Sequence, residues 1–290
     1  MRFPGALRAI ACLVAFAPLR AQVKVEPWVP AYQGVELASG EAPEPRRQKA
    51  FAVRVDLRAP GVRLFATPHA GSKETTSETT GEFLAHHRLQ VAINANFYDP
   101  CCTPGDKDLL GLAMSGGQVV SPAATHGIGQ AALVATRDNF ATILKTGPDF
   151  RTSGLWTAVA GTEVILADGV RSVAPIPFNK ATHPRTAVGL SRDGRYLILL
   201  VIDGRQAGYS VGATLDEVVD WLLRFGAADG LNLDGGGSTA LVREVEGQPR
   251  LVNHPSGVAL GSTSNAGGEP QQRSNGNNLG VFARPLPPAA

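Results

Sequence analysis

The chain has 290 residues, of which 43% are hydrophobic and 18% charged, and its formal net charge at pH 7 is +2. This length is enough for a sizeable core, and the composition is that of an ordinary globular protein. The net charge is too small to indicate nucleic-acid binding, which needs a basic patch or stripe. The 33 glycines and 21 prolines favour many turns and short strands over a helical bundle.

Residues 1–21 have the pattern of a cleavable secretory signal peptide. Arg2 and Arg8 stand at the start of a short apolar run, and a small residue, Ala21, stands at the expected cleavage point. The run is too short to span a bilayer as a helix. A lipoprotein interpretation through Cys12 leaves too little apolar sequence before the cysteine. We therefore expect a secreted or periplasmic protein with no integral membrane segment after cleavage.

The first half of the mature chain alternates between turn-rich stretches and short strand patterns. Residues 22–50 are predicted to be an N-terminal extension with a loop rich in proline and glutamate. The stretch "AFAVRVDLRAPGVRLFATP", residues 50–68, has the pattern of a hairpin or strand pair about the Pro60–Gly61 turn. A short helix is predicted in "TTSETTGEFLAHHRL", and a strand that enters a polar loop in "QVAINANFYDP".

The second half contains the clearest elements. "RTAVGLSRDGRYLILLVIDG" predicts a β-hairpin, and "TLDEVVDWLLRFGA" predicts a helix because its apolar residues share one face. "ALVREVEGQPRLV" predicts another hairpin and "LGVFA" a last strand. We therefore expect a single α+β domain over residues 51–284, with a mixed, mostly antiparallel β-sheet and a few packed helices, followed by a frayed tail at 285–290.

Two cysteines remain after removal of the signal peptide, Cys101 and Cys102, and they are adjacent in sequence. In an oxidising compartment they can form a vicinal disulfide, stay as free thiols or link to another chain. A zinc site is not expected, because the sequence has no second cysteine pair.

The stretch "LNLDGGGSTA", residues 231–240, places an acid at a strand end before three glycines. Its literal match to G-x-G-x-x-A suggests a dinucleotide loop, but β-like residues follow where that motif needs a helix. No lysine precedes Ser238, which excludes a Walker loop. An esterase with Ser238 as nucleophile and His254 as base is an alternative, although the G-x-S-x-G pattern is incomplete. The favoured interpretation is a carboxylate, Asp234, beside open backbone amides that suit an anion.

Two segments repeat the order helix, short link, strand, and then Asn-x-Asn or Asn-x-Asp. Alternation along a strand places Asn94 and Asn96 on one side of the first strand, and Asn232 and Asp234 on one side of the second. If the two strands lie close together, these four polar side chains converge at one mouth. The alternative is chance recurrence of a common order of elements.

Several blocks of the sequence, in order, resemble the phosphodiester glycosidase family: "INANFYDP", "HPRTAVGLSRDGRYLILLVIDGR", "LDEVVDWLLRFGA" and "LNLDGGGSTALV". The similarity extends from about Arg54 to Ala283. The family usually has glycines in the first block, as in "INGGFF", where this chain has Ala95 and Asn96.

This resemblance implies a hydrolase that converts a sugar-1-phosphodiester, of the N-acetylglucosamine-1-phosphodiester type, to a free sugar and a phosphomonoester. For exported bacterial relatives it implies a link to surface polysaccharides, so the expected partner is a sugar-phosphate or polysaccharide substrate. The alternative function is a non-catalytic glycan-binding or exopolysaccharide-associated protein.

Such a reaction must stabilise an oxocarbenium-like sugar and a negatively charged phosphate, and glycosidases commonly use two carboxylates. We expect Asp234 and Asp203 to be this pair, with Asp99 and Glu217 as reserves, although Glu217 also suits a helix cap. Arg185 is expected to hold the phosphate, because its planar guanidinium matches phosphate geometry. The other predicted substrate-binding residues are Asn94, Asn96, Asp99, Thr186, Asn232, Gly235, Gly236, Gly237, Ser238, Thr239 and Arg273.

Two alternatives apply to these candidates. Asp234, Asn232 and Asp203 could instead supply hard oxygen ligands for Ca²⁺ or Mg²⁺. Taken one at a time, each of the two residues also has an ordinary structural interpretation. Arg185 could simply pair with an acid, and Asp203 could simply be part of a turn with Gly204.

Overall fold

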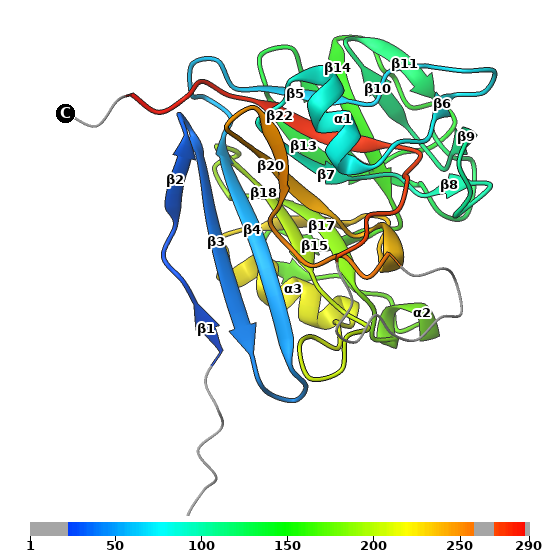
Figure 1. Cartoon of the computed structure of the whole chain (residues 1–290). Helices are drawn as coiled ribbons and strands as arrows, with labels where there is room; N and C mark the ends of the chain where they lie inside the picture. Colours follow the sequence, from blue (N-terminus) through cyan, green and yellow to red (C-terminus); the bar gives the residue numbers. More distant parts are fainter. Residues whose placement is uncertain (1–22, 258–269, 288–290) are drawn as a thin grey trace, which may run out of the picture.

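The computed structural model describes residues 23–257 and 270–287, and the predicted signal peptide lies outside these residues. The strands of the described residues form four sheets, and their ladders are antiparallel (Figure 1). The prediction of a mostly antiparallel sheet with a few helices is confirmed. No helix in the described part of the chain is both long and apolar enough to cross a membrane.

The large sheet has the strand order β1-β3-β4-β18-β17-β19-β15-β16, with β2 paired to β3. Its strands are β1 (Lys24–Val25), β2 (Val29–Tyr32), β3 (Val35–Ala42), β4 (Gln48–Asp56), β15 (Val164–Ala167), β16 (Val170–Arg171), β17 (Arg185–Leu190), β18 (Tyr196–Ile202) and β19 (Asp229–Asn232).

The other strands form three smaller sheets. The β7 sheet, in spatial order, contains β21 (Gln248–Leu251), β20 (Leu241–Val245), β7 (Val91–Asn94), β22 (Asn278–Phe282) and β5 (Arg63–Ala66). The β12 sheet contains β11 (Gln118–Ser121), β10 (Ala113–Ser115), β14 (Leu155–Gly161), β12 (Ala131–Thr136) and β13 (Ala141–Lys145). The small sheet contains β6 (Thr75–Thr76), β9 (Asp106–Leu109) and β8 (Tyr98–Asp99).

The main hydrophobic core joins the large sheet to the β7 and β12 sheets. It brings alternate residues of the large sheet, such as Val53 and Leu199, together with Ile93 of β7 and Leu133 of β12. Burial of one face of each strand is the main source of stability in such a layered fold. Because these three sheets share one core, the ends of β7, β17 and β19 are held in fixed relative positions.

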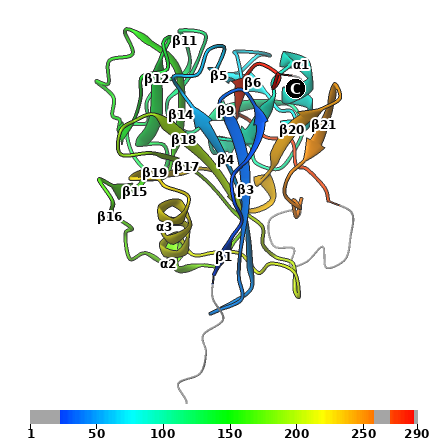
Figure 2. The same cartoon turned by 90° about the vertical axis from the view of Figure 1, so that its left-hand side faces the viewer.

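Two capped helices cover the outer faces. Helix α3 (Leu215–Arg224) lies against the large sheet (Figure 2). Its apolar face, which includes Trp221 and Leu222, packs on that sheet. Helix α1 (Thr80–His87) packs on the β7 sheet through Phe83 and Leu84. Both helices begin with a capping box, as their Thr-x-x-Glu sequences indicate. A third helix, α2 (Pro177–Lys180), is a single turn next to β17 in sequence.

The N-terminal half differs from the sequence prediction in two places. Residues 29–42, predicted to be part of an extension, form β2 and β3 of the large sheet. The hairpin or strand pair predicted within residues 50–68 does not form, because β4 pairs with β3 and β18 whereas β5 pairs with β22. At the other end of the chain Pro285 forms a bridge to Tyr32, so the chain is still held to β2 there.

Candidate active site

A cavity of about 380 Å³ lies where the chain leaves β7 and β19 and enters β17. Its lining consists of a Gly-rich loop, several arginines and a group of apolar side chains: Phe97, Tyr98, Cys101, Leu110, Phe178, His183, Arg185, Arg205, Asp234, Gly235, Gly236, Gly237 and Arg273. Of the predicted site residues, Arg185, Asp234, the three glycines and Arg273 are on this surface.

Asp234 is the one carboxylic acid among the described residues of this lining. Its backbone is fixed by two bonds, from its own N–H to the carbonyl of Ala95 (3.0 Å) and from Asn94 Nδ2 to its carbonyl (2.7 Å). Burial raises the pKa of Asp234 to about 7, while the neighbouring Ser238 hydroxyl and Arg273 act in the opposite direction. Asp234 is therefore a carboxyl group that can hold or release a proton near neutral pH.

The Gly-rich loop brings backbone close to Arg205. Gly236 has φ +62°, and a methyl group added to it would lie 3.0 Å from Arg205 Nη2, so a side chain at this position would displace the guanidinium. The Gly236 N–H donates to the carbonyl of Pro184 (2.9 Å). This amide is thus already bonded, contrary to the expectation that the whole loop offers free amides to an anion.

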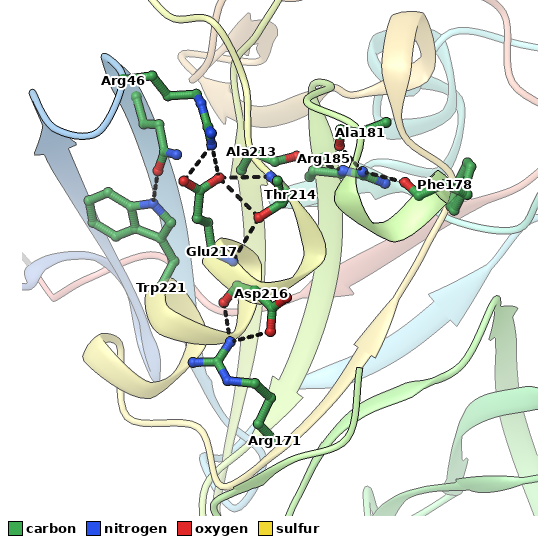
Figure 3. A network of polar contacts seen from close by, with 11 residues as sticks. Arg46, Arg171, Phe178, Ala181, Arg185, Ala213, Thr214, Asp216, Glu217 and Trp221 are labelled. Atoms are coloured by element: carbon green, nitrogen blue, oxygen red, sulfur yellow. Dashed lines mark hydrogen bonds and ion pairs between the residues drawn. The ribbon is translucent and has the colours of Figure 1, made fainter. Parts of the chain in front are cut away.

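Arg185 is buried at the start of β17 and makes no ion pair within the described residues. Its guanidinium donates to the carbonyls of Ala213 (2.9 Å), Ala181 (2.6 Å) and Phe178 (3.1 Å), as Figure 3 shows. Burial lowers the pKa of Arg185 to about 10, and the nearby Arg205 contributes to this shift. The geometry fixes a cation at the cavity without neutralising it.

Arg205 and His183 are lining residues that the sequence analysis did not select. The Arg205 guanidinium makes no hydrogen bond or ion pair within the described residues, and its pKa is lowered by burial and by Arg273. The pKa of His183 is lowered below its usual 6.5 by burial and by Arg185 and Arg205, so its imidazole is neutral at pH 7. Both lie in quoted motifs, but nothing in the alternation of residues marks them as facing a cavity.

Several predicted sugar-binding residues lie beneath the cavity rather than on its surface. Asn94 Oδ1 accepts hydrogen bonds from the Thr186 hydroxyl (2.8 Å) and from the Ala240 N–H (3.2 Å), and Thr186 also donates to the Thr239 hydroxyl (3.3 Å). All three polar side chains are buried. They connect β7 and β17 to the segment that follows the Gly-rich loop, so we assign them to positioning that loop.

Asn96 and Asn232 are also buried and bonded inside the protein. Asn96 Oδ1 accepts from the Ala160 N–H (2.8 Å) and from Asn277 Nδ2 (2.9 Å). Asn232 Nδ2 donates to the Thr162 hydroxyl (2.9 Å). The strand ends of the two helix–strand units lie close together, but of their four polar side chains only Asp234 lines the cavity.

Asp203 is buried and does not line the cavity with Asp234. Its carboxylate accepts hydrogen bonds from Asn253 Nδ2 (2.8 Å), from the His254 N–H (2.9 Å) and from the Tyr209 hydroxyl (3.2 Å). Burial raises the pKa of Asp203 to about 6, and these bonds oppose the rise. The contacts describe a carboxylate that joins two loops, and we do not retain it as the partner of Asp234.

The reserve acids lie elsewhere. Asp99 is exposed in β8, outside the cavity lining. Glu217 closes the capping box of α3 with Thr214 and pairs with Arg46 (Figure 3), which confirms its predicted role as a helix cap.

Among the described residues, no contact supports either the esterase alternative or the metal-site alternative. Ser238 Oγ and His254 Nδ1 are buried, and neither atom has a hydrogen-bond partner within the described residues, so they do not bond to each other. No group of three or more His, Cys, Asp or Glu side chains in the described part of the chain is arranged to hold a metal ion.

Cys101 and Cys102 form a disulfide, one of the outcomes left open by the sequence. Cys101 is part of the cavity lining, and its sulfur lies 4.0 Å from Arg273 Nη1. The pair therefore belongs to the site.

The cavity thus combines a carboxyl group, whose pKa is raised by burial to about 7, with three arginines at the strand ends of an antiparallel fold. The sequence profile of the phosphodiester glycosidase family matches residues 87–282, more than half of the chain. The chain belongs to the phosphodiester glycosidase family, as the resemblance of the sequence motifs implied.

Three solved structures share the fold. The catalytic domain of zebrafish N-acetylglucosamine-1-phosphodiester α-N-acetylglucosaminidase, auto-inhibited by its pro-peptide, has a TM-score of 0.65 at 18% identity, over 91% of this chain and 89% of that one. A hypothetical protein from Synechocystis has a TM-score of 0.56 at 16% identity, over 87% and 62%. A candidate exported protein from Burkholderia pseudomallei has a TM-score of 0.54 at 15% identity, over 81% and 74%. A search of curated proteins found no similar sequence.

Proposed function

We propose that the protein is an exported glycosidase that hydrolyses a sugar-1-phosphodiester to a free sugar and a phosphomonoester. The observation that carries the proposal is the Asp234 carboxyl, with a pKa of about 7, in one cavity with Arg185, Arg205 and Arg273. Family membership supports the reaction class. Export is supported by the signal-peptide pattern of residues 1–21 and by the fold shared with a candidate exported protein.

In this proposal Asp234 is the general acid. A bound phosphate raises its pKa further, because a neighbouring negative charge disfavours ionisation, and so keeps it protonated at neutral pH. Protonated Asp234 donates to the oxygen between sugar and phosphate while positive charge develops on the sugar. The arginines stabilise the phosphomonoester as it leaves.

The water that attacks the sugar needs a base, and His183 is the neutral titratable group on the lining that suits this role. Its pKa is lowered by burial and by the two arginines beside it, so the imidazole is free to accept a proton at pH 7. His183 takes the place that the sequence analysis gave to Asp203.

The experiment measures free N-acetylglucosamine released from UDP-N-acetylglucosamine and from N-acetylglucosamine-1-phospho-methylmannoside. We expect Asp234→Asn to lower kcat by about 100-fold or more. Asp229→Asn is the matched control, because Asp229 lies at the opposite end of β19 and accepts only the Asp168 N–H on its side chain. The control should keep the wild-type kcat.

The pH profile gives an independent test. Asp234 must be protonated, so kcat/KM should fall as pH rises through about 7. His183 must be neutral, so kcat/KM should also fall at acidic pH, below the usual imidazole range. Binding of both substrates without turnover would contradict the proposal and indicate a glycan-binding protein instead.

A further inference from the structure

One wall of the cavity is apolar and has no part in the proposed chemistry. Phe97 and Leu110 lie side by side, since the Leu110 N–H donates to the Phe97 carbonyl (2.8 Å), and both are partly exposed to the cavity. Cys101 also lines the cavity, and its sulfur lies 4.0 Å from Arg273 Nη1. Partly exposed apolar side chains gathered in a cavity are typical of a binding surface.

Phe178 adds an aromatic ring from another element. It lies on α2, is 41% exposed and lines the cavity. Its ring centroid lies 5.2 Å from the Arg185 guanidinium carbon, and its carbonyl accepts a bond from Arg185, as Figure 3 shows. The α2 turn is itself held by Asn179, whose side chain donates to Glu163 (2.6 Å). Phe178 is thus a fixed aromatic ring directly beside an uncompensated cation.

The contacts give an order along the cavity. Asp234 precedes the Gly-rich loop, and Arg205 lies over Gly236. Burial lowers the pKa of both Arg205 and Arg185, and the charge of Asp234 opposes this shift in Arg205 whereas the charge of Arg205 adds to it in Arg185. These interactions place Arg205 between Asp234 and the Arg185 guanidinium. Phe178 lies beyond Arg185. The sequence of groups is therefore acid, cations and then apolar ring.

From this order we propose that the phosphodiester substrate carries an apolar group, aromatic or alkyl, on the phosphate, and that this group binds against Phe178. The inference rests on the proposed function. The acid must reach the oxygen between sugar and phosphate, which puts the sugar at Asp234 and the phosphate at the arginines. The second ester group of the phosphate then continues past Arg185 onto Phe178.

A polar second group would find few partners there. The described residues of the lining include no Asn, Gln, Glu, Ser or Thr side chain, and the side chain that lies beside Arg185 is the aromatic ring of Phe178. Hydroxyl groups buried against such a surface lose their bonds to water without replacement, which is unfavourable. An apolar group gains from the same burial.

The test uses substrate pairs of equal charge. The benzyl and methyl esters of N-acetylglucosamine-1-phosphate differ only in the second group on the phosphate. We expect KM to be about 10-fold lower or more for the benzyl ester, the usual effect of an apolar group in an apolar pocket. Phe178→Ala should bring the ratio of the two KM values towards 1. Phe140→Ala, which removes a 79% exposed ring outside the cavity lining, should keep the wild-type ratio.

A second measurement does not depend on the sugar. Benzyl phosphate and methyl phosphate have the same charge and no sugar, and the Kd of benzyl phosphate should be about 10-fold lower or more. Equal KM values for the two esters, or equal Kd values for the two phosphates, would overturn the inference. Tighter binding of benzyl phosphate without hydrolysis of either ester would support the apolar subsite and contradict the proposed function.

Discussion

We predict that Asp203→Asn weakens catalysis through Arg205 while changing stability at pH 7 only modestly. Two effects on stability oppose each other. A pKa raised from 3.8 to about 6 means that the buried charge costs about 3 kcal/mol at pH 7, and the substitution removes this cost. Asparagine has one acceptor oxygen for the donors from Asn253, His254 and Tyr209, and each buried donor left unpaired costs about 1–3 kcal/mol. The net change should lie within about 2 kcal/mol.

The sign of the pH dependence follows from the same shift. The folded protein binds the Asp203 proton more tightly than the unfolded chain does. This contribution to stability is therefore full below pH 3.8 and is lost as pH rises through about 6. Thermal unfolding between about pH 4 and 7 should show a smaller decrease of Tm with pH in Asp203→Asn than in wild type. The same decrease in both proteins would show that Asp203 is not a buried carboxylate.

The effect on catalysis is measured by a double-mutant cycle. Asp203 and Arg205 belong to one loop, which is closed by the Arg205 N–H to Val211 carbonyl bond (3.1 Å). We expect each of Asp203→Asn and Arg205→Met to lower kcat/KM by about 10-fold or more, and the double variant to be little worse than Arg205→Met alone. Additive losses would refute the view that Asp203 acts by positioning Arg205.

Three further predictions concern the loop, the helix cap and the disulfide. Gly236→Ala should lower the free energy of unfolding by about 1–2 kcal/mol, measured in urea, and raise KM, because φ +62° disfavours alanine and its methyl group displaces Arg205. Glu217→Gln should lower stability by about 1 kcal/mol and leave kcat/KM unchanged, whereas a loss of turnover would restore Glu217 as a catalytic candidate. Replacing Cys101 and Cys102 by alanine should raise KM by roughly 2- to 10-fold in steady-state kinetics, and an unchanged KM would argue against a wall held by the disulfide.

Local sequence signals predicted those elements whose partners are close in the chain. The hairpin of β17 and β18, the hairpin of β20 and β21, and helix α3 with its capping box were all predicted correctly. The pairing of β5 with β22 joins segments more than two hundred residues apart, and no local pattern encodes it. The proline- and glutamate-rich composition after the signal peptide did not indicate β2 and β3, because the pairing of β2 with β3 and of β3 with β4 overrides weak local propensity.

The sequence analysis selected some residues that line the cavity, but it did not separate them from selected residues that are buried beneath it. Asp234 and Arg185 were selected because an acid before three glycines, and an arginine at a strand start, are unusual enough to stand out. Asp203 looked equivalent to Asp234, since both follow an apolar strand. What separates them is the segment at Asn253 and His254, which covers one carboxylate and leaves the other open to the cavity. That difference depends on contacts between distant segments.

The two helix–strand units meet end to end, yet they contribute unlike groups, and the hydrogen bonds explain why. Asn96 and Asp234 occupy the same position in their units. Asn96 Oδ1 accepts a hydrogen bond from the Ala160 N–H. On the other side of the amide, Asn96 Nδ2 donates to backbone carbonyl oxygens, including that of Leu112 (3.3 Å). A carboxylate there would face those carbonyls without a proton to donate, so the buried position requires an amide. The position of Asp234 lines the cavity and does not require an amide. Burial raises the pKa of Asp234 to about 7, a range that suits a general acid. The repeated pattern thus yields one buried amide within the scaffold and one carboxyl group that lines the cavity.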